Sequence, residues 1–108
     1  EALIHDFNEA FKKVDVLISP TLPVMPNDIG DDYVDLNGER VLLLPQFIRL
    51  TNPLNITGTP TLSVPCGFNG DLPVGIQITG PAFADGLVLK TSYAIEKMNL
   101  LGGKYPKL

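Results

Sequence analysis

The sequence predicts an α/β fold, and three observations from different parts of the chain support this. Apolar residues recur every three or four positions near the start, as they do on one face of a helix. A nearly continuous β-branched and apolar run follows at residues 14–19, and two alternating apolar segments surround a turn within residues 61–79. A helix followed closely by strands is typical of a domain in which helices pack against a sheet.

The first predicted helix ends at about Lys13. Its apolar stripe consists of Leu3, Ile4, Phe7, Ala10, Phe11 and Val14. The next segment, residues 14–19, is β-branched and apolar on both faces and ends before Pro20, which predicts a buried strand that is parallel to its neighbours. Three prolines within residues 20–26 lack an N–H donor, so the chain is expected to leave the sheet along an extended path.

The middle of the chain carries weaker signals. Residues 27–40 are acidic, contain glycine and have no period, which predicts a surface loop. In residues 41–50 the spacing of Phe47, Leu50 and Leu54 predicts a helix face, and Pro53 is expected to end or kink that helix near Asn52.

Residues 61–68 and 73–79 predict a β-hairpin, with residues 69–71 as its tight connection. The alternation places Leu62, Val64, Cys66 and Phe68 on one face, with Val74, Ile76 and Ile78 on the same face of the second strand. The opposite face carries the small residues Ser63, Gly67 and Gly75, which would let a helix or another segment approach the backbone closely. Alternatively, these glycines mark bulges or strand ends. Pro65 and Pro73 also require unpaired or bulged positions.

A last helix is predicted over residues 86–99, with Asp85 as its cap. Its inner stripe is predicted to consist of Leu87, Thr91, Ala94, Ile95 and Met98. Gly102 and Gly103 are expected to close it.

The composition excludes several classes of partner and location. The chain has 108 residues, a net charge of −4 and no basic run, so neither nucleic acid nor an anionic membrane is expected as a partner. The longest apolar run is residues 41–45, far short of the ~20 residues that span a bilayer. The single Cys66 and the absence of a basic, then apolar, start predict a cytoplasmic protein. Because Glu1 already falls within a helical pattern, the chain is expected to be part of something longer.

Motifs for metal or cofactor chemistry are weak. Asp35, Asn37 and Gly38 match part of a calcium loop, but its end positions would be Tyr33 and Leu44, which supply no carboxylate. With one histidine and one cysteine there is no ligand spacing for a transition metal, and no phosphate-binding glycine motif occurs, so no metal and no cofactor is predicted.

Nucleophilic catalysis also lacks a motif. Ser19, Ser63 and Ser92 lie in neither a G-x-S-x-G elbow nor an S-x-x-K pair. A Cys66 nucleophile with His5 as its base stays conceivable, although it needs a third, orienting group. Otherwise, His5 is expected on a helix surface and Cys66 as a small apolar strand residue.

Several segments together resemble the C-terminal end of amidase signature enzymes. These are residues 15–23 (D-V-L-I-S-P-T-L-P), 55–68 (N-I-T-G-T-P-T-L-S-V-P-C-G-F), 72–78 (L-P-V-G-I-Q-I) and 94–96 (A-I-E). The resemblance implies that residues 1–108 are the C-terminal segment of an α/β/α domain with a mixed central sheet, and that they contribute late strands, including a hairpin, and flanking helices. The N-terminal catalytic part of that domain is absent from this chain.

The resemblance also implies the chemistry of the intact enzyme, which hydrolyses a small-molecule carboxamide to a carboxylate and ammonia or an amine. In that family a serine, a second serine on a cis peptide and a lysine act from the earlier part of the protein, so no residue here is assigned a catalytic role and the chain is expected to be inactive alone. In that family the C-terminal segment typically completes the central sheet and forms part of the substrate-pocket wall. This makes residues 21–26 and the loop before Asn52 the pocket candidates, above all Thr21, Leu22, Pro23 and Val24.

Departures from the family pattern bear on the subtype. Residues 41–51 lack the methionine-tyrosine and acidic residues usual in the enzyme that transamidates glutamyl-tRNA, which disfavours that role; Pro81 and Asp85 also differ from the family's common residues. Two alternative functions stay open for the chain. It could be part of an A-type subunit of a glutamyl-tRNA amidotransferase, or a free-standing, non-catalytic interaction domain. Because residues 14–19 are apolar on both faces while only two helices are clearly predicted, the isolated chain is expected to self-associate.

Overall fold

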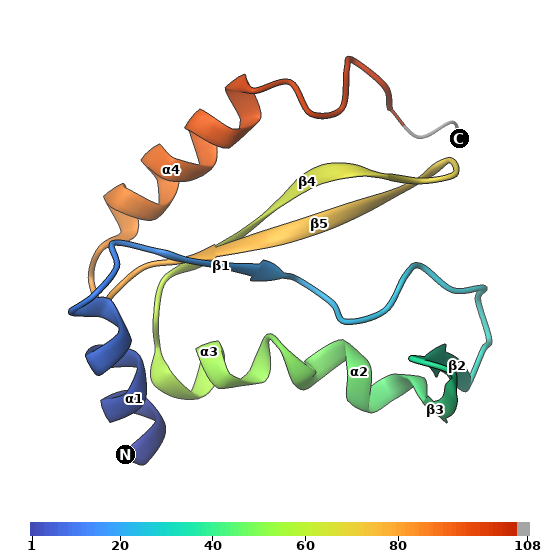
Figure 1. Ribbon diagram of the computed structural model, residues 1–108, viewed down its shortest axis with the longest axis horizontal. Helices are drawn as coiled ribbons and strands as arrows, with labels where there is room; N and C mark the ends of the chain where they lie inside the picture. The colour runs from blue at the N-terminus through green and yellow to red at the C-terminus, as the bar shows by residue number, and fades with distance from the viewer. Residues whose placement is uncertain (106–108) are drawn as a thin grey trace.

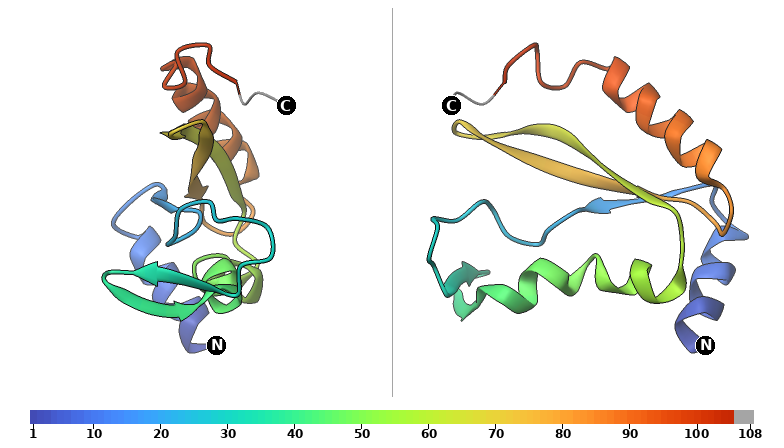
Figure 2. Two further views of the ribbon diagram at one scale, coloured as in Figure 1. Left: turned by 90° about the vertical axis from the view of Figure 1, so that its right-hand side faces the viewer. Right: turned by 180° about the vertical axis from the view of Figure 1, so that it is seen from behind.

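A computed structural model describes residues 1–105. The main sheet has three strands. Figure 1 shows this sheet with helix α4 (Asp85–Lys97) on one side and helices α2 (Leu43–Arg49) and α3 (Asn52–Thr57) on the other, and Figure 2 shows the same layers in two further views. The elements in chain order are α1 (Ala2–Phe11), β1 (Leu17–Pro20), β2 (Tyr33–Leu36), β3 (Glu39–Leu42), α2 (Leu43–Arg49), α3 (Asn52–Thr57), β4 (Thr61–Asn69), β5 (Leu72–Thr79) and α4 (Asp85–Lys97). No helix among the described residues is long and apolar enough to cross a bilayer.

The main sheet has the strand order β1-β5-β4, and both of its ladders are antiparallel. β1 pairs with β5 so that Ile18 lies opposite Ile78. The prediction of a parallel strand at residues 14–19 is therefore wrong, because a continuous apolar run indicates burial on two faces without fixing strand direction. Its burial is also incomplete: Ile18 is 57% exposed on the edge strand, since α4 packs over β4 and β5.

The predicted hairpin at residues 61–79 is confirmed as β4 and β5. Asn69 pairs with Leu72, which leaves Gly70 and Asp71 as a two-residue turn. Gly70 adopts φ +63°, a left-handed conformation that glycine reaches without a steric penalty.

A second hairpin, β2–β3, occupies the stretch that the sequence predicts to be a surface loop. Tyr33 pairs with Leu42 at its open end, and Asn37 and Gly38 form its turn with φ +53° and +83°. Two successive positive φ values favour the type I′ turn, for which Asn-Gly is the preferred pair. The Arg40 guanidinium lies 4.7 Å from the centre of the Tyr33 ring across the strands. The loop prediction is wrong because acidic residues on the exposed side of this short hairpin obscure its alternation of apolar and polar residues.

The predicted helix after residue 41 is present, but Pro53 acts differently from the prediction. α2 ends at Arg49, and α3 begins at Asn52 with Pro53 in its first turn. Proline is tolerated there because the first N–H groups of a helix have no partner within it. Gly58, at φ +68°, ends α3 and donates its N–H to the Leu54 carbonyl. The break near Asn52 is therefore confirmed, and a second short helix follows it.

Helix α4 is present where the sequence predicts it, but with three differences. Asp85 is the first helical residue, after Ala84 as N-cap, and its side chain makes no capping hydrogen bond. The buried positions are Val88 and Ser92, each 3% exposed; of the predicted stripe, Thr91 and Ile95 are half-buried, whereas Leu87, Ala94 and Met98 are exposed. The helix ends at Lys97, before Gly102 and Gly103. The most buried positions of α4 lie one residue later than predicted because Val88 fits against Gly80, directly after β5. Helical spacing alone does not indicate this contact.

The buried apolar residues lie in two places, at the contact of the sheet with α4 and on the helices α2 and α3. Ile78 is fully buried, and a Cβ on Gly80 would lie 2.7 Å from Cγ2 of Val88, so only glycine leaves room for that side chain. Leu43 of α2 and Leu54 of α3 are also buried. The first predicted helix is confirmed as α1; its stripe contacts α3, but none of its residues is fully buried.

Candidate functional site

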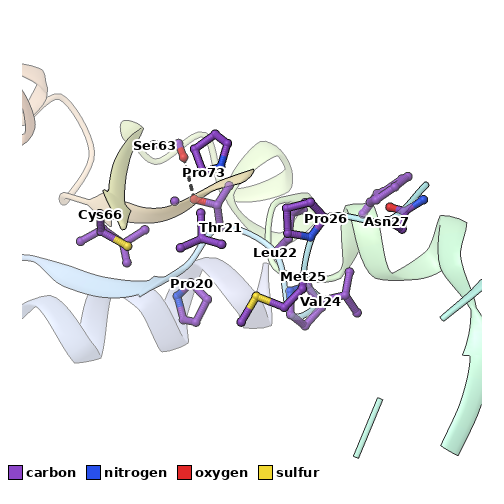
Figure 3. Close-up of a pocket in the computed structure, with 15 residues that line it drawn as sticks. Pro20, Thr21, Leu22, Val24, Met25, Pro26, Asn27, Ser63, Cys66 and Pro73 are labelled. Atoms are coloured by element: carbon purple, nitrogen blue, oxygen red, sulfur yellow. Dashed lines mark hydrogen bonds between the residues drawn. The ribbon is translucent and has the colours of Figure 1, made fainter. Parts of the chain in front are cut away.

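A cavity of about 570 Å³ is lined by the β4–β5 hairpin, by residues 20–27 and by one residue of α2, and no residue of α4 lines it. The extended segment after β1 forms one wall and the hairpin another (Figure 3). The lining residues are Pro20, Thr21, Leu22, Pro23, Val24, Met25, Pro26, Asn27, Phe47, Ser63, Cys66, Pro73, Val74, Gly75 and Ile76. The four pocket candidates, Thr21 to Val24, therefore all lie along one cavity. From the segment before Asn52, Phe47 reaches the lining.

Thr21 is held against the hairpin by two hydrogen bonds. Its backbone N–H donates to the Gly75 carbonyl at 3.2 Å, and its hydroxyl lies 2.6 Å from the Ser63 hydroxyl. A Cβ on Gly75 would lie 3.1 Å from Ser63 Oγ and 3.3 Å from Thr21 Oγ1. The prediction that small residues let another segment approach the backbone is thus confirmed at Gly75, and the approaching segment is the one that carries the pocket candidates.

A β-bulge changes the faces of the first hairpin strand. Pro65 pairs with Gly75 and Gly67 with Val74, so Cys66 is an extra residue between them. Cys66 lines the cavity, while Leu62 and Val64 lie on the side of α4. The predictions that Cys66 shares their face and that Gly67 belongs to the small face are therefore wrong. A bulge beside Pro65 is the irregular position that this proline requires.

Gln77 joins the sheet to the helices that flank the cavity, and sequence reasoning missed this role. Its Nε2 donates to Ser19 Oγ at 3.0 Å and to the Leu50 carbonyl at 2.9 Å, and the residue is 4% exposed. Because Leu50 follows α2 directly, this amide anchors the end of the helix that carries Phe47. The signal for it in the sequence was an uncharged hydrogen-bonding side chain between two isoleucines that the alternation buries.

Charged and metal-binding groups do not gather at the cavity. Within residues 1–105, no charged side chain lines it, and no group of three or more His, Cys, Asp or Glu residues could hold a metal ion. His5 lies exposed on α1, as predicted, and does not join Cys66 in the lining. The hydroxyls of Ser19 and Ser63 bond to Gln77 and Thr21, neither of which can act as a general base. The cavity therefore offers a ligand a shaped, uncharged surface and neutral hydrogen-bonding groups.

Comparison with known proteins agrees with this arrangement. The family model for Amidase matches residues 1–89. The chain belongs to the amidase family. A solved amidase structure superimposes with a TM-score of 0.85 and 33% identity, over 90% of this chain and 22% of that one. A bacterial aryl acylamidase of the amidase signature (AS) enzymes family gives a TM-score of 0.79 and 31% identity, over 95% of this chain and 22% of that one. The predicted α/β amidase-signature fold is thus confirmed.

Curated relatives of this amidase-family chain bear on the subtype. The A-type subunit of the glutamyl-tRNA(Gln) amidotransferase of Halothermothrix orenii is 42% identical over 105 residues, 96% of this chain and 21% of the relative. The corresponding protein of Methanosarcina barkeri is 42% identical over 93 residues, 86% of this chain and 18% of the relative. The chain therefore spans about a fifth of the length of these relatives. Both relatives carry the name of the subtype that the departures at residues 41–51 disfavour.

Proposed function

We propose that this chain forms one wall of the substrate pocket in an amidase that hydrolyses a carboxamide to a carboxylate and ammonia or an amine. The observation that carries the proposal is the cavity along Thr21 to Val24, in a chain of the amidase family. The resemblance to amidase signature enzymes implies a pocket wall in the same segment. An apolar, mostly preformed cleft with a few convergent polar groups is the usual form of a small-molecule site.

In this proposal the catalytic groups come from outside the chain. Acyl transfer needs a nucleophile, a base beside it and donors for the oxyanion. The Ser63 hydroxyl meets the Thr21 hydroxyl, and no acidic or basic side chain in the described part of the chain lines the cavity. The isolated chain is therefore expected to release no ammonia from amides.

The surface of the chain supports its being part of a larger domain. It exposes 7793 Å² at a mass of 11.7 kDa, whereas a compact monomer of this mass exposes about 5,900 Å². The radius of gyration is 15.5 Å, compared with about 13 Å for a compact domain of this length. The excess of about 1,900 Å² is more than twice the ~800 Å² that one partner contributes to a standard protein interface. This area would be covered by the rest of an amidase domain, or by a second copy when the chain is alone.

A graft tests the proposal. Residues 1–108 replace the matching segment of the bacterial aryl acylamidase, and amine release from its amide substrate is measured beside the truncated host and the isolated chain. We expect turnover from the graft and none from the two controls. A graft that elutes and unfolds like the host but releases no amine would refute the proposal. Turnover by the isolated chain that survives repurification and is lost in Cys66→Ala would instead support a cysteine mechanism.

Self-association of the isolated chain has its own test. Light scattering over a concentration series and binding of an apolar dye report the uncovered area directly. We expect mass to rise with concentration, together with dye binding. A monomer that binds no dye and unfolds cooperatively would support the alternative of a free-standing interaction domain.

A second candidate function is that of an A-type subunit of a glutamyl-tRNA(Gln) amidotransferase, which the 42% identity to the Halothermothrix orenii protein favours. The same segment is grafted into that protein, and amidation of glutamyl-tRNA(Gln) by the assembled enzyme is compared with hydrolysis of simple amides. If the chain belongs to a stand-alone amidase, amide hydrolysis is retained and amidation of the tRNA is impaired. Full amidation activity would favour the second candidate.

A further inference from the structure

Helix α4 has an outer side that faces away from the sheet. Val88 and Ser92 are buried where the helix packs on the strands, whereas Leu89 and Tyr93 are 61% and 58% exposed. Lys97 follows Tyr93 by one turn, and its Nζ lies 5.0 Å from the centre of the Tyr93 ring. Because these exposed residues are spaced four apart, they form one row along the helix, which we call the outer row.

An apolar hollow flanks the outer row. A cavity of about 640 Å³ is lined by Leu62 and Val64 of β4, by Leu89 and Tyr93 of α4 and by Leu100 of the segment after α4, among others. Leu62 and Leu100 are 36% and 48% exposed. Exposed leucine and tyrosine side chains beside a hollow are typical of a surface that another protein covers.

The charges of α4 are arranged symmetrically about Tyr93. Lys90 lies three residues before it and Glu96 three residues after it, and both are exposed. Three residues fall about 60° short of a full helical turn, so Lys90 lies on one flank of the outer row and Glu96 on the other. Within residues 1–105, neither side chain forms an ion pair. The two charges are therefore available to another molecule.

A second copy of the same helix complements this arrangement. A half-turn about an axis through Tyr93 makes the two helices antiparallel and exchanges both their ends and their flanks. Lys90 of each copy is then placed opposite Glu96 of the other, and the two Tyr93 side chains meet at the axis. The ion pair occurs twice, because a two-fold interface repeats every contact. Complementary charges around an aromatic centre fix the orientation of the partner.

The open surface of the chain is large enough for such a contact. Its excess over a compact monomer is about 1,900 Å², and one partner contributes ~800 Å² to a standard interface. An interface of that size on the outer side of α4 leaves more than half of the excess to be covered by the rest of an amidase domain.

We propose that the outer side of α4 is a two-fold interface between two copies of this chain, centred on Tyr93 and oriented by the pairs of Lys90 with Glu96. The inference goes beyond the proposed function and does not depend on it, since no residue of α4 lines the cavity beside the hairpin. It names the surface through which the isolated chain self-associates.

Charge reversal in the full chain tests the pairing, with the dimer dissociation constant measured by analytical ultracentrifugation. Lys90→Glu places like charges opposite each other at both pairs, so it is expected to weaken the dimer about tenfold. Lys90→Glu combined with Glu96→Lys makes both pairs attractive again. The dissociation constant of this double variant is expected to lie within about threefold of that of the unchanged chain.

Matched controls separate the pairing from net charge. Lys13→Glu makes the same change in net charge at an exposed residue outside α4, and it is expected to change the dissociation constant by less than about twofold. Lys13→Glu combined with Glu96→Lys keeps the net charge of the unchanged chain but leaves like charges at both α4 pairs, so the dimer is expected to stay weak. Far-UV circular dichroism checks that each variant is folded.

A disulfide locates the two-fold axis. In a chain that carries Cys66→Ala, Tyr93→Cys places one thiol of each copy at the axis, whereas Ala94→Cys moves it by about 100° around the helix. Ala94 is exposed, so both thiols are open to a mild oxidant. Linked dimers are expected to form about tenfold faster with Tyr93→Cys, because a disulfide requires the two Cβ atoms to lie close together.

Several results would overturn the inference. These are a chain that stays monomeric at all concentrations, equal weakening by Lys90→Glu and Lys13→Glu, a double variant at positions 90 and 96 that stays weak, or equal rates of disulfide formation. A dimer whose dissociation constant responds to none of the α4 variants would mean that the copies meet through another surface. The amidase proposal fails separately, since its test is amine release by the graft.

Discussion

The two faces of the β1–β5–β4 sheet are filled differently around the two glycines Gly80 and Gly75. Toward α4, Ile78 is fully buried, and Val88 occupies the space above Gly80 so closely that even a methyl group would collide with it. On the other face, Gly75 is approached by the hydroxyls of Thr21 and Ser63, beside a cavity of about 570 Å³. Toward α4 the packing is close at Ile78 and Gly80, although a cavity of about 640 Å³ lies farther along β4 and α4, whereas the other face is left hollow beside Gly75 by small polar groups.

The difference shows how one pair of strands can serve both stability and binding. Large side chains on alternate residues supply the burial that holds α4. The residues between them are small or hydrogen-bonded, so the opposite face keeps room for a ligand at little cost to the core. Substitutions on the first face should therefore act on stability, and substitutions on the second should act on binding.

The largest effect is expected from Ile78→Ala on the packed face. Loss of a fully buried isoleucine should lower the free energy of unfolding by about 2–5 kcal/mol. Ile18→Ala is the matched control, because Ile18 pairs with Ile78 across the ladder but is 57% exposed. Urea unfolding followed by far-UV circular dichroism at low protein concentration gives both values. Equal losses of unfolding free energy in the two variants would mean that a second copy of the chain buries Ile18.

An intermediate effect is expected from Gln77→Met, which keeps the length of the side chain but removes the donor. Ser19 Oγ and the Leu50 carbonyl would lose their partner inside the protein, and the free energy of unfolding should fall by about 1–3 kcal/mol. Gln46→Met is the control, since Gln46 makes one long bond of 3.4 Å to the Leu42 carbonyl. If both variants are equally stable, the Gln77 amide does not hold α2 to the sheet.

The smallest effect is expected at the tip of the hairpin, away from both faces. Lys104 Nζ donates to the Gly70 carbonyl at 3.0 Å and lies 3.5 Å from an Asp71 carboxylate oxygen and 4.6 Å from the centre of the Phe68 ring. These contacts are exposed, so Lys104→Met should change the free energy of unfolding by less than about 1 kcal/mol. A larger loss in the same urea assay would show that the C-terminal tail contributes to the fold.

The parts that sequence patterns predicted are those whose signals are local. The β4–β5 hairpin carries its alternation and its turn residues within one stretch, and α1 carries its period within its own length. The direction of β1 and the one-residue shift of the α4 stripe depend on distant partners, β5 and Gly80. The β2–β3 hairpin had a local signal, Asn37-Gly38 between alternating residues, which its acidic composition obscured.

The candidate site divides in the same way. The segment from Thr21 to Val24 was identified through a family resemblance, and its place along the cavity agrees with the small residue predicted at position 75. Phe47 reaches the lining through a distant contact, the anchor at Gln77. Cys66 reaches it through a bulge beside Pro65, an irregular position that the proline indicated without fixing which residue is extra.

A pair of glycine variants tests the division between the two faces most directly. Gly80→Ala places its methyl group against Val88, and Gly75→Ala places it against the hydroxyls of Ser63 and Thr21. For each variant, the free energy of unfolding is measured, together with the affinity of the folded chain for benzamide, a simple amide of the class that the proposed function hydrolyses. Gly80→Ala should cost about 1–3 kcal/mol of stability with affinity unchanged, since overpacking strains the core. Gly75→Ala should weaken benzamide more than it lowers stability. If both variants lose stability and affinity in the same proportion, the two faces do not have separate tasks.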